Sequence, residues 1–165
     1  MKLPHGSKTQ DLDAYYMKLA IKEAQKSLLI DEVPIGAIIV QNGKITARAH
    51  NCVETKNNSL KHAEIIAIEK AIKKNGYKHL LDCTLYVTLE PCTMCAGAIV
   101  LSRIPKIVFG AYDAKAGACG SVYNICGDGK LNHKPEIVAG VLQKECAFLL
   151  SNFFSVLRAK KKSRI

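Results

Sequence analysis

The chain has 165 residues, 48% hydrophobic and 23% charged, a composition that supports one globular domain with a buried core and excludes a disordered chain. Lys and Arg number 24 against 14 Asp and Glu, and the net charge of +10 indicates a polyanionic partner unless the lysines only form a solvated face. No run of 18 apolar residues occurs, and the N-terminus lacks the apolar stretch of a secretory signal, so we expect no membrane partner and a cytoplasmic location.

Hydrophobic patterning predicts alternating helices and strands. Apolar side chains recur at helical spacing after Asp11 and Asp13, either of which can cap a helix. Asn42-Gly43 is the strongest hairpin signal, and Gly76 is the expected end of the second helix. In chain order, we expect a helix over 11–29, strands over 35–40 and 45–49 around a hairpin at 41–44, a helix over 62–76, a strand over 84–89, a helix over 92–101, strands over 106–110 and 136–141, and a helix from 142 to about 162.

This order of elements predicts an α/β fold. The irregular segment 111–135 is too long for a simple hairpin, so we expect it to cross over and to leave its two flanking strands parallel. The result is a three-layer α/β/α sandwich around a mixed five-stranded sheet. Residues 1–165 are predicted to form a single domain that ends in a basic helix and tail at about 142–165.

Two short motifs predict the chemistry of the protein. His62-Ala63-Glu64 is followed, after 26 residues, by the run Pro91-Cys92-Thr93-Met94-Cys95. One imidazole and two thiolates suit zinc, and three ligands is the number that a catalytic zinc takes, because its fourth position holds water. Glu64 beside that water can accept its proton and pass it on, which a structural zinc site does not need.

Both motifs are expected at the first turns of helices. There the unpaired N–H groups and the helix dipole lower the pKa values of the Cys92 and Cys95 thiols. These cysteines are three residues apart, so they lie on one helix face and can bind one ion. A redox pair is the alternative for Cys-x-x-Cys, but it leaves His62 and Glu64 unexplained.

The cysteine content and the charge of the C-terminal segment indicate the cellular compartment and the type of substrate. Seven scattered cysteines, an odd number, indicate a reducing cytoplasm and not a disulfide framework. The last 20 residues contain no acidic residue, and beside a nucleobase-processing site this favours nucleic acid over a free nucleoside. The basic residues of this tail are Arg158, Lys160, Lys161, Lys162 and Arg164.

The order His-x-Glu…Pro-Cys-x-x-Cys is typical of zinc-dependent nucleobase deaminases. Within that group the chain resembles the bacterial tRNA-specific adenosine deaminases of the cytidine deaminase-like superfamily, from about Tyr15 to Arg158. The zinc motifs are shared by the superfamily, whereas Asp113-Ala114-Lys115 and Phe153-Phe154 are more particular to the tRNA enzymes. The matching segments are 33–37, 51, 62–65, 85–98, 108–115, 120–121, 132–133 and 153–154.

The resemblance implies a zinc-dependent hydrolase that converts adenosine to inosine at the wobble position of a tRNA anticodon loop. One Zn²⁺ per subunit is held by His62, Cys92 and Cys95, and Glu64 is the catalytic residue that moves protons. The enzymes are similar in forming homodimers whose shared groove receives the anticodon stem-loop. The substrate-binding residues that the resemblance implies are Asn51, Ala63, Asp113, Lys115, Phe153, Phe154 and Arg158.

Alternatives stand beside this interpretation. A deaminase of free bases or nucleosides would share every zinc residue, although the net charge and the basic tail argue against it. A zinc-stabilised nucleic-acid-binding module without catalysis would need a fourth ligand, and the chain has spare cysteines and histidines. Apart from the resemblance, Asn51 is a loop-capping residue and Asp113 a turn former. Ser155 and Leu157 stand at tail positions that are often basic in the family, whereas Arg158 matches the family.

Overall fold

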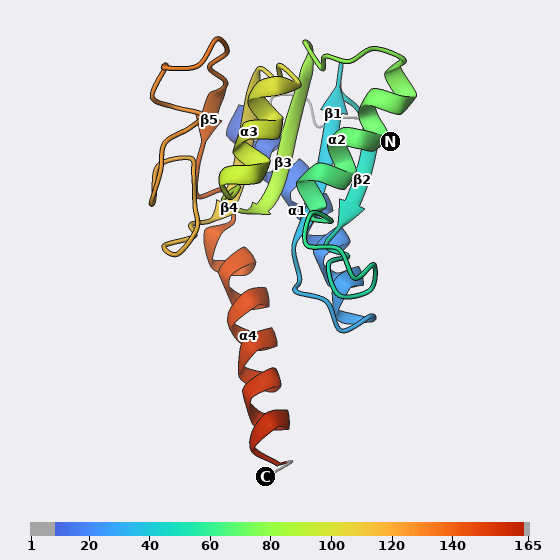
Figure 1. Ribbon diagram of the computed structural model, residues 1–165, viewed down its shortest axis with the longest axis vertical. Coiled ribbons are helices and arrows are strands. Elements are labelled where there is room, and N and C mark those ends of the chain that lie inside the picture. Colours follow the sequence, from blue (N-terminus) through green and yellow to red (C-terminus); the bar gives the residue numbers. More distant parts are fainter. Residues whose placement is uncertain (1–8, 164–165) are drawn as a thin grey trace.

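The computed structural model describes residues 9–163 and consists of one sheet with helices on both faces (Figure 1). The elements are α1 (Thr9–Leu28), β1 (Gly36–Gln41), β2 (Lys44–His50), α2 (Ala63–Asn75), β3 (Cys83–Leu89), α3 (Thr93–Leu101), β4 (Lys106–Ala111), β5 (Glu136–Val138) and α4 (Gln143–Lys162). Their order and types confirm the predicted α/β architecture.

The sheet is mixed and five-stranded, with the strand order β2-β1-β3-β4-β5. β1 is antiparallel to both β2 and β3, whereas β3, β4 and β5 run parallel. The parallel pairing of β4 and β5 confirms that the segment between them crosses over. Because β1 runs opposite to its neighbours, the ends of β2, β3 and β4 lie at the edge of the sheet where β1 begins.

Nearly continuous burial of the central strands supports the three-layer arrangement. Along β1, Ile39 packs with the residues of α2 and α3, whereas Ile38 packs on the opposite face with Tyr16 and Met17 of α1. The approach of α1 to the sheet is so close at Gly36 that an added Cβ would lie 2.1 Å from the Ala20 carbonyl oxygen. Two apolar cores therefore hold the sheet between the helical layers.

The C-terminal part of the fold differs from the sequence prediction in one respect. The strand expected over 136–141 ends at Val138, because Gly140 (φ 78°) and Leu142 (φ 51°) have left-handed backbone conformations that turn the chain. α4 then runs away from the body of the domain (Figure 1), and Cys146 is its one buried residue. Arg164 of the predicted basic tail lies outside the described residues. Within residues 9–163, no helix has the length and apolar character needed to cross a membrane.

Candidate metal centre and active site

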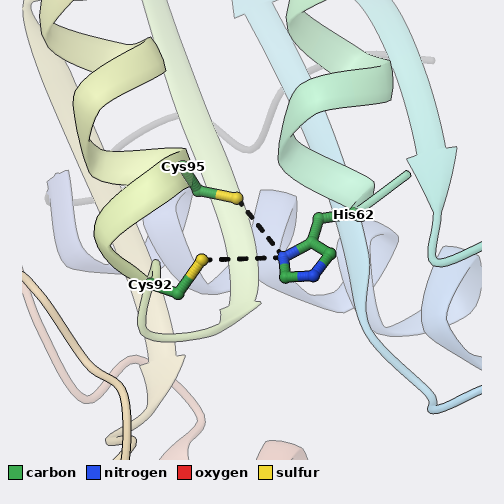
Figure 2. A group of neighbouring side chains, drawn as sticks. All are labelled: His62, Cys92 and Cys95. Atoms are coloured by element: carbon green, nitrogen blue, oxygen red, sulfur yellow. Dashed lines mark hydrogen bonds between the residues drawn. The ribbon is translucent and has the colours of Figure 1, made fainter. Parts of the chain in front are cut away.

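The predicted metal ligands come together at one edge of the sheet. His62 is the N-cap of α2, and Cys92 is the N-cap of α3, which follows β3 directly. The His62 Nδ1 atom lies 3.6 Å from the Sγ atoms of both Cys92 and Cys95 (Figure 2). All three ligand atoms lie within 4.8 Å of one another, and no fourth His, Cys, Asp or Glu of residues 9–163 joins the cluster.

This geometry fits zinc. Ligand distances of about 2.3 Å to sulfur and about 2.0 Å to nitrogen, at tetrahedral angles, place nitrogen and sulfur about 3.5 Å apart. The observed 3.6 Å for both pairs therefore leaves room for one ion between them. A cluster of three protein ligands is the pattern of a catalytic centre, because a structural centre is closed by a fourth ligand.

One of the two thiols, that of Cys92, is electrostatically prepared to bind a cation, whereas the lowered pKa expected for Cys95 at the same helix start is not found. The hydrogen bond with Cys95 lowers the pKa of Cys92 to about 4; burial opposes this shift, and His62 adds to it. The same hydrogen bond, together with burial, raises the pKa of Cys95. The hydrogen bond with Cys92 also raises the pKa of His62. Cys92 therefore loses its proton first, at a helix N-terminus where a thiolate is favoured.

Glu64 lies in the first turn of α2 with 4% of its surface exposed. Burial raises the pKa of its carboxyl group to about 7, although a backbone N–H and the His62 ring oppose the shift. Its Oε2 atom is buried without a hydrogen-bond partner among the described residues. A buried oxygen that the fold does not satisfy, next to a metal cluster, is available to a reacting molecule.

Asn51 follows β2 at the same edge of the sheet and is 4% exposed. Its backbone N–H donates to the Ile35 carbonyl (3.0 Å), and its side-chain Nδ2 donates to Glu32 Oε2 (3.3 Å). The Glu32 carboxylate is fully buried and also accepts from the Thr55 N–H (2.6 Å). The backbone N–H of Asn51 thus closes the loop, as expected of a loop-capping residue. The Oδ1 atom of the Asn51 side chain, however, has no hydrogen-bond partner among the described residues.

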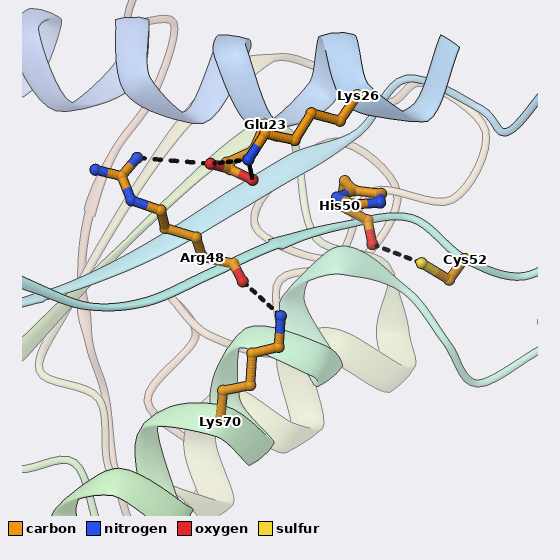
Figure 3. Close-up of polar contacts among 6 residues, drawn as sticks. All are labelled: Glu23, Lys26, Arg48, His50, Cys52 and Lys70. Atoms are coloured by element: carbon orange, nitrogen blue, oxygen red, sulfur yellow. Dashed lines mark hydrogen bonds and ion pairs between the residues drawn. The ribbon is translucent and has the colours of Figure 1, made fainter. Parts of the chain in front are cut away.

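A polar cluster fixes the strand that leads into Asn51 (Figure 3). The buried Glu23 of α1 accepts from Lys26 (2.8 Å) and lies 3.6 Å from Arg48 of β2. Lys70 of α2 donates to the Arg48 carbonyl (2.8 Å), so that β2 is tied to helices on both faces of the sheet. Beyond it, the Cys52 thiol donates to the His50 carbonyl (3.4 Å). These contacts tie the strand that precedes Asn51 to the helices on either side of it.

Glu90 is a residue that the sequence analysis did not single out. Its carboxylate accepts 3.0 Å hydrogen bonds from the N–H groups of Asp113, Cys119 and Ser121, and a further one from the Ser121 hydroxyl. Burial alone would raise the pKa of Glu90, but these hydrogen bonds hold it below its usual range. The carboxylate thereby holds the loop after β4 against the N-terminus of α3. The position of Glu90 immediately before Pro91-Cys92 is the feature of the sequence that could have identified it as part of the site.

The same loop requires glycine at position 117, where a bridge pairs it with Cys92. An added Cβ would lie 2.4 Å from the Glu90 carboxylate and 2.6 Å from the Asp113 carbonyl oxygen. We expect Gly117→Ala to destabilise the protein by about 1–3 kcal/mol, because neither neighbour can move freely. Thermal denaturation measures the effect, with Gly97→Ala as the control, since an added Cβ there has no neighbour within 4 Å. Equal melting temperatures for the two variants would contradict the expectation.

The remaining predicted substrate residues lie in three places, namely the start of α2, the loop after β4, and α4. Ala63 is the fully buried first residue of α2, beside His62. Asp113 accepts from the N–H groups of Lys115 and Ala116, so it forms a turn and leaves the Lys115 side chain exposed. Phe153, Phe154 and Arg158 lie farther along α4, and the structure does not bring them to the metal cluster. Their rings and charges lie on a helix that projects from the domain, and their roles stay predictions.

An open cluster of one His and two Cys at two helix N-termini, with a buried Glu beside it, is the arrangement of zinc-dependent nucleobase deaminases. In agreement, residues 11–158 match the MafB19-like deaminase family. The chain is 54% identical over 151 residues to a tRNA-specific adenosine deaminase of Bacillus subtilis, covering 92% of this chain and 94% of that one. A Streptococcus pyogenes protein of the same name is 46% identical over 149 residues, covering 90% and 94%. The chain belongs to the tRNA-specific adenosine deaminase family.

Solved structures agree with this assignment. A structure described as a tRNA:A34 deaminase that edits A to I at the wobble position is 40% identical with a TM-score of 0.79, over 82% of this chain and 99% of that one. A guanine deaminase from Bacillus subtilis is 39% identical with a TM-score of 0.57, but the match covers only 59% of this chain and 63% of the guanine deaminase chain. A guanine deaminase from Nitrosomonas europaea matches 85% of this chain with a TM-score of 0.75 but only 23% identity, so the fold is shared and the sequence identity favours the tRNA enzymes.

Proposed function

We propose that this protein hydrolyses the adenine amino group of the wobble adenosine in a tRNA anticodon loop, giving inosine and ammonia. The observation that carries the proposal is the three-ligand cluster beside the unpaired, buried Oε2 of Glu64. The near full-length similarity to tRNA-specific adenosine deaminases supports the substrate. A binding module without catalysis is disfavoured, since the described cluster has three ligands and not four.

His62, Cys92 and Cys95 would hold one zinc ion per subunit. Zinc supplies a Lewis acid that makes water a nucleophile near neutral pH. Glu64 takes a proton from the attacking water and delivers it to ring nitrogen N1 as the oxygen bonds to C6 of adenine. Glu64 then moves the remaining hydrogen of the added oxygen to the amine; the C6–N6 bond breaks, C6 becomes a carbonyl, and ammonia leaves. Atoms balance as adenosine plus water gives inosine plus ammonia.

The remaining substrate contacts belong to the same proposal. Asn51 and the backbone at Ala63 bind the base, while Asp113, Lys115, Phe153, Phe154 and Arg158 contact the anticodon stem-loop. Exposed apolar side chains on α4, among them Phe148 (66% exposed) and Phe154 (40%), support a homodimer in which a second copy covers part of this helix. Location in the cytoplasm accords with a tRNA substrate and with seven free cysteines.

The direct test is incubation of the purified protein with an anticodon stem-loop, followed by sequencing to map A-to-I changes. We expect conversion at the wobble position and none with free adenosine, because a hairpin loop already presents an unstacked base. Guanine is the informative comparison, given the partial likeness to a guanine deaminase. Equal efficiency on free adenosine or guanine would favour a deaminase of free bases or nucleosides.

Binding of the stem-loop should depend on salt through the exposed basic end of α4. We expect replacement of Arg158, Lys161 and Lys162 by Gln to make the slope of log affinity against log salt shallower by up to about 2, at about 0.7 per lost phosphate contact. The rate at saturating RNA should change little, because these residues lie far from the metal cluster.

The control removes the same amount of charge from another place. Lys73, Lys74 and Lys78 lie exposed at or just beyond the C-terminal end of α2, whereas the metal cluster lies at its N-terminal end. Replacing these three by Gln should leave the slope near that of the wild type. Equal slopes for the two triple variants would show that the α4 charges do not contact the RNA.

A further inference from the structure

The Asn51 side chain is held by a group that can bind it in one orientation only. Glu32 is fully buried, and its carboxylate accepts from the Asn51 Nδ2 (3.3 Å) and from the Thr55 N–H (2.6 Å). Burial opposes ionisation of this carboxyl group, but the hydrogen bonds from Thr55 and Asn51 hold its pKa below the usual value. An ionised carboxylate accepts and cannot donate, so it selects the amide nitrogen of Asn51 and turns the amide oxygen away.

The selected orientation leaves the Asn51 Oδ1 atom buried without a partner among residues 9–163. Buried oxygens of this kind are ordinarily satisfied, so its position indicates a donor supplied by a ligand. Asn51 and the metal ligands follow strands that end at the same edge of the sheet. One Nδ2 hydrogen also stays available, since an amide nitrogen carries two.

We propose that Glu32 is a positioning residue that fixes the Asn51 amide so that Oδ1 accepts from the 6-amino group of the substrate base and discriminates against the 6-oxo product. Adenine presents an amino donor at C6 next to the acceptor N7, which matches an amide oxygen and an amide N–H. Inosine presents a carbonyl oxygen at C6, which would face the Asn51 oxygen and be repelled. The locked amide thus favours substrate binding and product release. This inference rests on the proposed function and adds a specificity device to it.

The test compares binding of two anticodon stem-loops, one with adenosine and one with inosine at the wobble position. Glu64→Ala serves as the parent protein, because it should bind the adenosine stem-loop and convert it too slowly to change the binding measurement. We expect the parent to prefer adenosine by about tenfold, the effect of one mismatched buried hydrogen bond. Adding Glu32→Gln should bring the two affinities close together, because a glutamine can present either its oxygen or its nitrogen and no longer selects one amide orientation.

Matched variants separate positioning from a general structural effect. Glu54→Gln removes an exposed carboxylate from the loop that carries Asn51 and Thr55, and it should keep the adenosine preference. Asn51→Ala should lose the adenosine preference. Combining Glu32→Gln with Asn51→Ala should cause no further change in the ratio of the two affinities. Zinc content should equal that of the parent in every variant. If Glu32→Gln does not fold, Glu32→Asp replaces it: its shorter side chain no longer reaches the Asn51 Nδ2, so the preference should again be lost.

Two results would overturn the inference: no adenosine preference in the parent, or a preference that persists in Glu32→Gln or in Asn51→Ala. Failure of the proposed function is distinguishable, because wild-type protein is assayed in parallel for conversion of the adenosine stem-loop. If the wild type converts the adenosine stem-loop but the parent shows no adenosine preference, the proposed role of Glu32 is contradicted and the deaminase proposal is not. Absence of conversion contradicts the deaminase proposal itself.

Discussion

Replacing Glu64 by Ala is expected to reduce turnover of an anticodon stem-loop by about 10²–10⁴-fold, the usual contribution of a positioned general acid–base group. Glu64 is buried beside the candidate metal cluster with one carboxyl oxygen unpaired among the described residues, so the substitution removes the group that we propose moves protons. Zinc content and RNA affinity should stay near wild type, because the three ligands are untouched. Single-turnover rates, elemental analysis and binding titrations measure the three quantities separately.

Glu69→Gln is the control for this experiment. It removes a carboxylate from the same helix, but Glu69 is 58% exposed and pairs with Lys61 at the surface. Its rate should therefore match that of the wild type. A Glu64→Ala rate within about threefold of the wild type would remove this residue from the mechanism, since a lost transition-state contact lowers the rate far more.

Replacing both Cys92 and Cys95 by Ser is expected to abolish zinc binding and to lower the melting temperature by about 10 °C. This shift corresponds to the loss of a ligand whose free concentration is about a thousand times its dissociation constant. An ion held by these ligands would join the first turns of α2 and α3, so its loss would release a link between two parts of the fold. A strong chelator should lower the melting temperature of wild-type protein by a similar amount.

Cys52→Ser provides the comparison, because Cys52 is half-buried and lies outside the cluster. This variant should retain one zinc per chain and melt near the wild type. One zinc per chain in the double variant, measured by elemental analysis, would refute the assignment of these ligands.

Local signals in the sequence were sufficient to predict most of the fold. Gly76 adopts the left-handed conformation (φ 66°) that ends α2, and Asn42-Gly43 forms the expected turn between β1 and β2. Such signals act through neighbouring residues, so they can be interpreted without knowing the rest of the chain. The predicted ligands also come together in the structure, since both motifs lie at helix starts on one edge of the sheet.

The sequence by itself determined the class of chemistry and the order of the elements, because spacing and residue type depend on local geometry alone. The tertiary structure decided which residues support the site. Glu32 and Glu90 are separated from their partners by 19 to 31 residues, and each acquires its role only when distant loops meet its carboxylate. The length of β5 and the direction of α4 were decided in the same way, by the turn at Gly140 and Leu142 and by packing at Cys146. Contacts of this kind depend on where the whole chain folds, and no local pattern specifies them.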